Sequence, residues 1–116
     1  MNQAGVVLIT GDYYRALIAE NAAIMDLAEQ QAKVTSAESF VLSTHYELGD
    51  INGKNADIRK HQEIVTLEKA PIYTEEVLAC RELERKVLQC SAERKRQEAV
   101  IKLTTAWLYS QAGVVP

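Results

Sequence analysis

The chain has 116 residues, of which 47% are hydrophobic and 25% are charged, and its formal net charge is −3. This length allows one domain with a modest core, and this composition is ordinary for a soluble globular protein, which excludes a disordered chain. Only five glycines and two prolines interrupt the sequence, and such sparse breaks favour long helices over the many turns of a small β-protein. The mixed charge leaves no strongly basic face that would demand a nucleic-acid partner.

The first part of the chain divides into an arm and a long helix. Residues 1–11 are expected to be extended, because Val6, Val7 and Ile9 are β-branched and no helical period is visible there. Residues 12–48 are expected to form a helix, because their apolar side chains recur in alternating steps of three and four, as in a coiled coil. This stripe consists of Leu17, Ile24, Leu27, Val34, Ala37, Val41 and Leu48.

A turn is predicted over residues 49–55, between two helices. Its glycines allow the left-handed backbone that ends a helix, and Asn55 can cap a second helix over residues 56–70. Pro71 lacks a backbone donor and therefore breaks this second arm, so that a third helix is expected over residues 74–112. The predicted fold is a single all-α domain, a long antiparallel coiled-coil-like hairpin with a proline-broken second arm.

The turn also predicts a register for the hairpin. If the chain folds back at Gly53, residues whose numbers sum to about 106 lie opposite one another. Five successive layers then pair apolar residues from both arms, which the turn alone does not require. These layers are Leu48 with Ile58, Val41 with Val65, Val34 with Ile72, Leu27 with Leu78 or Ala79, and Ile24 with Leu83.

In this register the third helix is longer than its partner. Residue 12 lies level with about residue 94, so residues 95–113 overhang, although they contain the richest apolar stretch of the second arm and the only tryptophan. An exposed apolar segment of this kind predicts an oligomer interface. The interface residues expected here are Val100, Ile101, Leu103, Trp107 and Leu108.

A two-helix hairpin covers only one stripe of each helix, and several large side chains of the first helix lie outside that stripe. Either the third helix folds back to form a three-helix bundle, or a second chain covers them. Self-association, with a dimer favoured, is the preferred interpretation, because long hairpins with uncovered flanks commonly pair into four-helix bundles. The side chains concerned are Tyr13, Tyr14, Ile18, Met25, Phe40 and Tyr46.

A basic segment on the third helix is the candidate contact for nucleic acid or an acidic protein partner. It contains Arg94, Lys95 and Arg96, and Lys102 follows two turns later. Glutamates are interleaved with these bases, and Glu98 stands four residues before Lys102, a favourable spacing on a helix. A solvated, ion-paired face is therefore favoured over a nucleic-acid footprint.

No residue pattern points to catalysis or a cofactor, and a metal-dependent activity at His45 and His61 is the least favoured hypothesis. His45 and His61 lie level in the hairpin register, but the Glu-x-x-His spacing of di-metal bundles is absent. Cys80 and Cys90 stand ten residues apart on one helix, roughly 15 Å, too far for a disulfide. They are expected to be reduced thiols, which fits a cytoplasmic protein, and no apolar run has the length of a signal or a membrane span.

One resemblance concerns the turn and the start of the returning helix. The run from Gly53 through Lys54, Asn55, Ala56, Asp57 and Ile58 to Arg59 resembles the turn between long helices in small all-helical proteins of bacteriophages and prophages. The resemblance implies a structural or accessory role, sometimes near recombination, in the bacterial host cytoplasm, and transfers no catalytic residue. The sequence thus predicts a non-enzymatic protein acting through protein contacts, with a nucleic-acid-binding accessory protein as the alternative.

Overall fold

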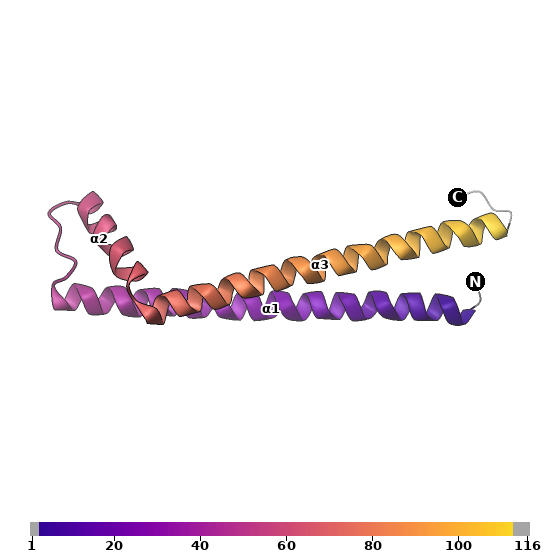
Figure 1. Ribbon diagram of the computed structural model, residues 1–116, viewed down its shortest axis with the longest axis horizontal. Helices are drawn as coiled ribbons and strands as arrows, with labels where there is room; N and C mark the ends of the chain where they lie inside the picture. The colour runs from indigo at the N-terminus through magenta and orange to yellow at the C-terminus, as the bar shows by residue number, and fades with distance from the viewer. Residues whose placement is uncertain (1–2, 113–116) are drawn as a thin grey trace. The chain divides into compact units, whose positions relative to one another are not determined.

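The computed structural model describes residues 3–112, and these residues form three helices and no strand. Helix α1 spans Gln3–Leu48, α2 spans Ala56–Glu68 and α3 spans Pro71–Gln111 (Figure 1). The predicted all-α hairpin with a broken second arm is therefore confirmed.

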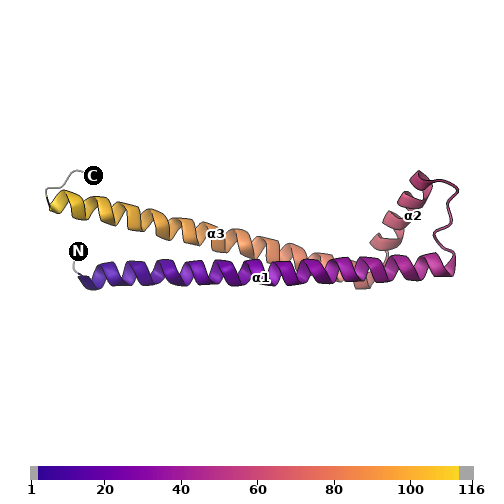
Figure 2. The same cartoon turned by 180° about the vertical axis from the view of Figure 1, so that it is seen from behind.

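The chain divides into two compact units. The terminal unit comprises Met1–Met25 and Arg85–Pro116, and the elbow unit comprises Asp26–Glu84. Within the terminal unit, α1 and α3 run side by side in opposite directions, as both views show (Figures 1 and 2). The elbow unit contains the end of α1, the whole of α2 and the start of α3.

The helix boundaries correct two predictions. The extended arm over residues 1–11 is wrong, because α1 already begins at Gln3, while residues 1 and 2 lie outside the described part of the chain. β-Branched residues cost a helix only about half a kcal/mol each, too little to end one without a proline. Helix α3 begins at Pro71 and not at residue 74, because proline lacks only a donor that the first helical position does not use.

The corner after α1 is closed by backbone hydrogen bonds. Gly49 has a φ of +80°, its N–H donates to the Tyr46 carbonyl at 3.2 Å, and the Asp50 N–H donates to the His45 carbonyl at 3.0 Å. This pair of bonds is the Schellman arrangement that ends many helices. Ile51, which is 4% exposed, then anchors the corner by burying its side chain.

The rest of the corner is fastened to the first turns of α2. The Asn55 side chain accepts a hydrogen bond from the Ile58 N–H at 2.9 Å and so caps α2. The Gln62 side chain accepts from the Gly53 N–H at 2.8 Å, and Arg59 donates to the Gly53 carbonyl at 3.0 Å. The predicted turn over residues 49–55 therefore forms, and its side chains join the loop to the helix that follows.

Most of the buried apolar residues are small. Helices whose facing side chains are short can approach closely, but they bury little apolar area in doing so. No large side chain among the described residues is fully buried. The buried apolar residues are Ala16 and Ala23 in the terminal unit, and Ala37, Val41, Ile51 and Cys80 in the elbow unit.

A polar contact shows the register of the elbow unit. Gln30, which is buried, donates from its side chain to the Glu76 carbonyl at 3.0 Å and to the Glu76 carboxylate at 2.5 Å. These residue numbers sum to 106, as the turn predicts. The predicted apolar layers are only partly right, because the chain turns away after Leu48 and the elbow leaves the other side chains uncovered. Six of their members are exposed, namely Ile24, Leu48, Ile58, Ile72, Leu78 and Ala79.

The close packing of Gly53 leads to a stability prediction. A Cβ at this position would lie 2.5 Å from Ile58 Cγ2 and 3.0 Å from the Arg59 backbone nitrogen, so the corner would have to shift. We expect Gly53→Ala to lower the free energy of unfolding by about 1–3 kcal/mol in urea titrations followed by circular dichroism. Gly11→Ala is the matched control, because its Cβ fits within α1 and should stabilise the helix by about 0.5–1 kcal/mol. Unchanged stability of Gly53→Ala would contradict this description of the corner.

Candidate functional site

An ion pair joins the two helices of the terminal unit. Arg94 Nε donates to Glu20 Oε1 at 2.6 Å, and Arg94 Nη1 donates to Glu98 Oε1 at 2.7 Å. Glu20 is only 8% exposed although it is charged. The hydrogen bond from the guanidinium lowers the pKa of Glu20 below its ordinary value, which keeps the carboxylate ionised. A buried acid on α1 is thus matched by a base on α3.

This ion pair corrects the predicted overhang. The predicted register places Arg94 level with residue 12, but Arg94 binds Glu20, eight residues further along α1. Helix α1 also extends back to Gln3, so it lies beside most of the segment that was expected to overhang. Residues 95–113 are therefore not an unpartnered extension, and the exposed apolar surface must be sought on the outward faces of the helices.

The five residues of α3 predicted as an oligomer interface fall on different faces. Ile101 and Leu108 follow the arginine of the ion pair by seven and fourteen residues, so they share its face toward α1, and both are half-buried. Val100 is also half-buried. Leu103 is 73% exposed and Trp107 is 42% exposed. Of the five predicted interface residues, only Leu103 and Trp107 are exposed to solvent.

A second apolar stripe runs along α1 in the terminal unit. Tyr14, Ile18 and Met25 are 57%, 67% and 72% exposed. Each stands two residues from a buried position of the same helix, which is about 200° around the helix axis. One face of α1 therefore packs against α3, and the opposite face presents these three large side chains to solvent. Phe40 and Tyr46, which were also expected to lack cover, are exposed in the elbow unit.

The basic segment of α3 is largely neutralised within the chain. Arg94 is held by the two carboxylates described above, and Arg96 donates to both carboxylate oxygens of Glu93, at 3.0 and 2.8 Å. The hydrogen bonds that Glu93 accepts, first from Arg96 and then from Gln97, lower the pKa of Glu93 to about 2. Lys95 and Lys102 are exposed and have no ion-pair partner in the described part of the chain. This arrangement does not favour the nucleic-acid alternative, which needs several free bases.

The histidines and cysteines do not form a common site. His45 Nδ1 lies 2.7 Å from Asp50 Oδ2 at the corner, and His61 is exposed. Within residues 3–112, no group of three or more His, Cys, Asp or Glu side chains is placed to hold a metal ion. Cys80 and Cys90 are both free thiols, and burial raises the pKa of Cys80. A raised pKa makes the Cys80 thiol a weaker nucleophile at neutral pH, because less of it is ionised.

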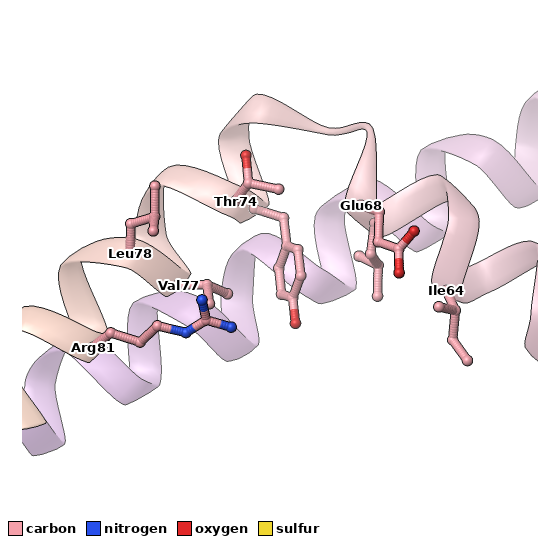
Figure 3. A pocket seen from close by; sticks show the side chains of 8 residues that line it. Ile64, Glu68, Thr74, Val77, Leu78 and Arg81 are labelled. Carbon is pink, nitrogen blue, oxygen red and sulfur yellow. The ribbon is translucent and has the colours of Figure 1, made fainter.

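A groove between α2 and α3, here called the elbow groove, was not anticipated from the sequence. It has a volume of about 430 Å³ and is mainly apolar. The break at Pro71 was the available signal, because a chain that changes direction leaves a wedge between the two helices that it joins. Its lining residues are Ile64, Leu67 and Glu68 from α2, with Tyr73, Thr74, Val77, Leu78 and Arg81 from α3 (Figure 3).

Comparison with known proteins gave no match to this chain among protein families, curated proteins or solved structures. Within residues 3–112, none of the helices combines the length and the apolar character needed to cross a membrane. The exposed apolar stripe of α1 and the elbow groove are the features from which a function can be argued.

The Glu20–Arg94 pair predicts a pH-dependent stability. Because the folded-state pKa of Glu20 is lowered, its ionised form stabilises the fold above the unfolded-state pKa, and this stability is lost as the pH falls through the folded-state value. We expect Glu20→Gln to lower the melting temperature by roughly 3–8 °C at neutral pH and by little in acid, as measured by circular dichroism.

The matched control for this prediction is Glu98→Gln, which removes the other carboxylate on the same arginine. The Glu98 side chain is 38% exposed, against 10% for Glu20, so solvent screens its charge and the shift should be smaller. A Glu20→Gln shift of equal size at neutral and acid pH would show that the substitution disturbs packing and that the charge is not responsible.

Proposed function

We propose that this chain is a non-enzymatic, self-associating helical protein that acts through protein–protein contacts. The observation that carries the proposal is the exposed stripe of Tyr14, Ile18 and Met25 on α1, opposite the face that packs against α3. Soluble monomers seldom leave several large apolar side chains in line on a helix, and such a line is typical of a surface that another helix covers.

The free energy available from covering this stripe favours association with a second copy of the chain. Covering an exposed Ile or Met side chain completely stabilises a complex by roughly 1.5–3 kcal/mol before the cost of association is subtracted. The outward face of α3 in the terminal unit adds Leu103 and Trp107. Two copies that each contribute a pair of helices can form a four-helix bundle, in which each hairpin buries its second stripe against the other. A homodimer is therefore the favoured assembly.

The resemblance to small phage proteins is compatible with this function. In the corner, Gly53, Asn55 and Arg59 are all engaged in holding the loop against α2. The motif that carries the resemblance thus builds the turn, and no chemistry is assigned to it. We infer a structural or accessory role of the kind that the resemblance implies, performed by the apolar faces.

A pair of substitutions on α1 tests the proposal. Ile18→Glu combined with Met25→Glu places two charges on the stripe, so we expect the dimer Kd to rise at least about a hundredfold. Light scattering coupled to gel filtration should then show a change toward the monomer mass of 12.9 kDa. Ala19→Glu is the control, because residue 19 is exposed but lies about 100° from the stripe.

The tryptophan supplies an independent readout of the same equilibrium. Trp107 is the only tryptophan and is 42% exposed, so its emission should shift to shorter wavelength as rising protein concentration drives association. A wild-type protein that remains monomeric at micromolar concentration, with emission independent of concentration, would refute self-association.

A further inference from the structure

The walls of the elbow groove come from two helices that meet at a bend. Ile64 and Glu68 lie on the α2 wall, four residues apart and therefore on one face, and Val77 and Arg81 have the same spacing on the α3 wall. In the close-up, the Arg81 guanidinium extends along the groove toward the α2 side, and Leu78 points outward from α3 (Figure 3). All of these residues belong to the elbow unit.

The groove combines apolar area with one unpaired charge of each sign. Ile64 is 48% exposed and Leu78 is 58% exposed, so both walls present apolar side chains to solvent. Glu68 and Arg81 are exposed, and neither side chain makes a hydrogen bond or ion pair within the described residues. A lining with one acid and one base does not select a strongly charged ligand. It is complementary to a surface that carries the same two charges in the opposite order.

A second copy of this chain presents such a surface. In a two-fold interface, any contact from one residue to another is made twice, once in each direction. Leu78 and Arg81 are three residues apart and lie on one ridge of α3, and a helix ridge packs into a groove on the surface of its partner. When this ridge enters the groove of a second copy, Leu78 lies against the apolar walls and Arg81 lies beside Glu68 of that copy.

We infer that the elbow groove is a two-fold contact between copies of this chain, in which Glu68 of each copy pairs with Arg81 of the other. This inference rests on the proposed self-association and assigns it a surface in the elbow unit. The charge pair sets the orientation of the contact, and Ile64, Val77 and Leu78 provide its apolar area.

Charge reversal tests this arrangement, because the single variants and the rescue experiments have opposite expected outcomes. Glu68→Arg alone and Arg81→Glu alone place like charges together, so each should raise the Kd of self-association at least about tenfold in sedimentation experiments. An equimolar mixture of these two variants restores both opposite-charge pairs, and so does the double variant. Both should return the Kd to within about threefold of wild type.

Controls are reversals of exposed charges on the same helices that do not line the groove. Lys60→Glu on α2 and Glu75→Arg on α3 should leave the Kd within about threefold of wild type. Circular dichroism should show unchanged helicity for every variant, because neither Glu68 nor Arg81 has a partner within the described chain.

The outcomes separate this inference from the proposed function. If wild type associates but the single reversals do not weaken association, or if they weaken it and neither the mixture nor the double variant restores it, the elbow contact is wrong. The proposed function then stands provided that the α1 substitutions still dissociate the protein. A monomeric wild type would overturn both. Weakening of each single variant with recovery in both rescue arms would establish the reciprocal pair.

Discussion

The ion pair between Glu20 and Arg94 is the contact on which the terminal unit depends. Its carboxylate is almost completely buried, and a slip along the helices would leave the Glu20 charge buried without its partner on α3, which is strongly destabilising. The hydrogen bonds from Gln30 to Glu76 impose a similar condition in the elbow unit. Polar contacts therefore select the register in each unit, as single polar residues do in coiled coils.

The alanines that lie between the two helices explain why large apolar side chains are exposed on the surface. Ala16, Ala23 and Ala37 allow the backbones to approach, but each removes little apolar area from water. The larger apolar residues are displaced to other faces, where Ile18 and Leu103 remain mostly exposed. Packing through alanines allows close approach but buries little apolar area. The large apolar side chains therefore stay exposed, where a second copy of the chain can cover them, as the proposed function requires.

The sequence predicts the three helices, the corner and the register in which Gln30 meets Glu76, because caps, glycines and apolar spacing are local signals. It does not predict that Glu20 is buried, since a lone acid between alanines has the pattern of a solvated face until its base on α3 is known. The prediction that residues 95–113 overhang was wrong for the same reason, because the register of the terminal unit depends on the pairing of Glu20 with Arg94. The candidate interface was only partly predicted, because apolar content does not show which face of α3 a residue such as Ile101 or Leu103 occupies.

The corner and the elbow have opposite consequences for function. In the corner, the side chains of Asn55, Arg59 and Gln62 are used to hold the loop, so little remains there for a partner to recognise. At the elbow, Pro71 starts a new helix in a new direction and leaves Glu68 and Arg81 without partners on the walls of a groove. A continuous helix would have had no such groove. The break in the second arm therefore produces the elbow groove, which combines a concave shape, apolar area and two opposite charges.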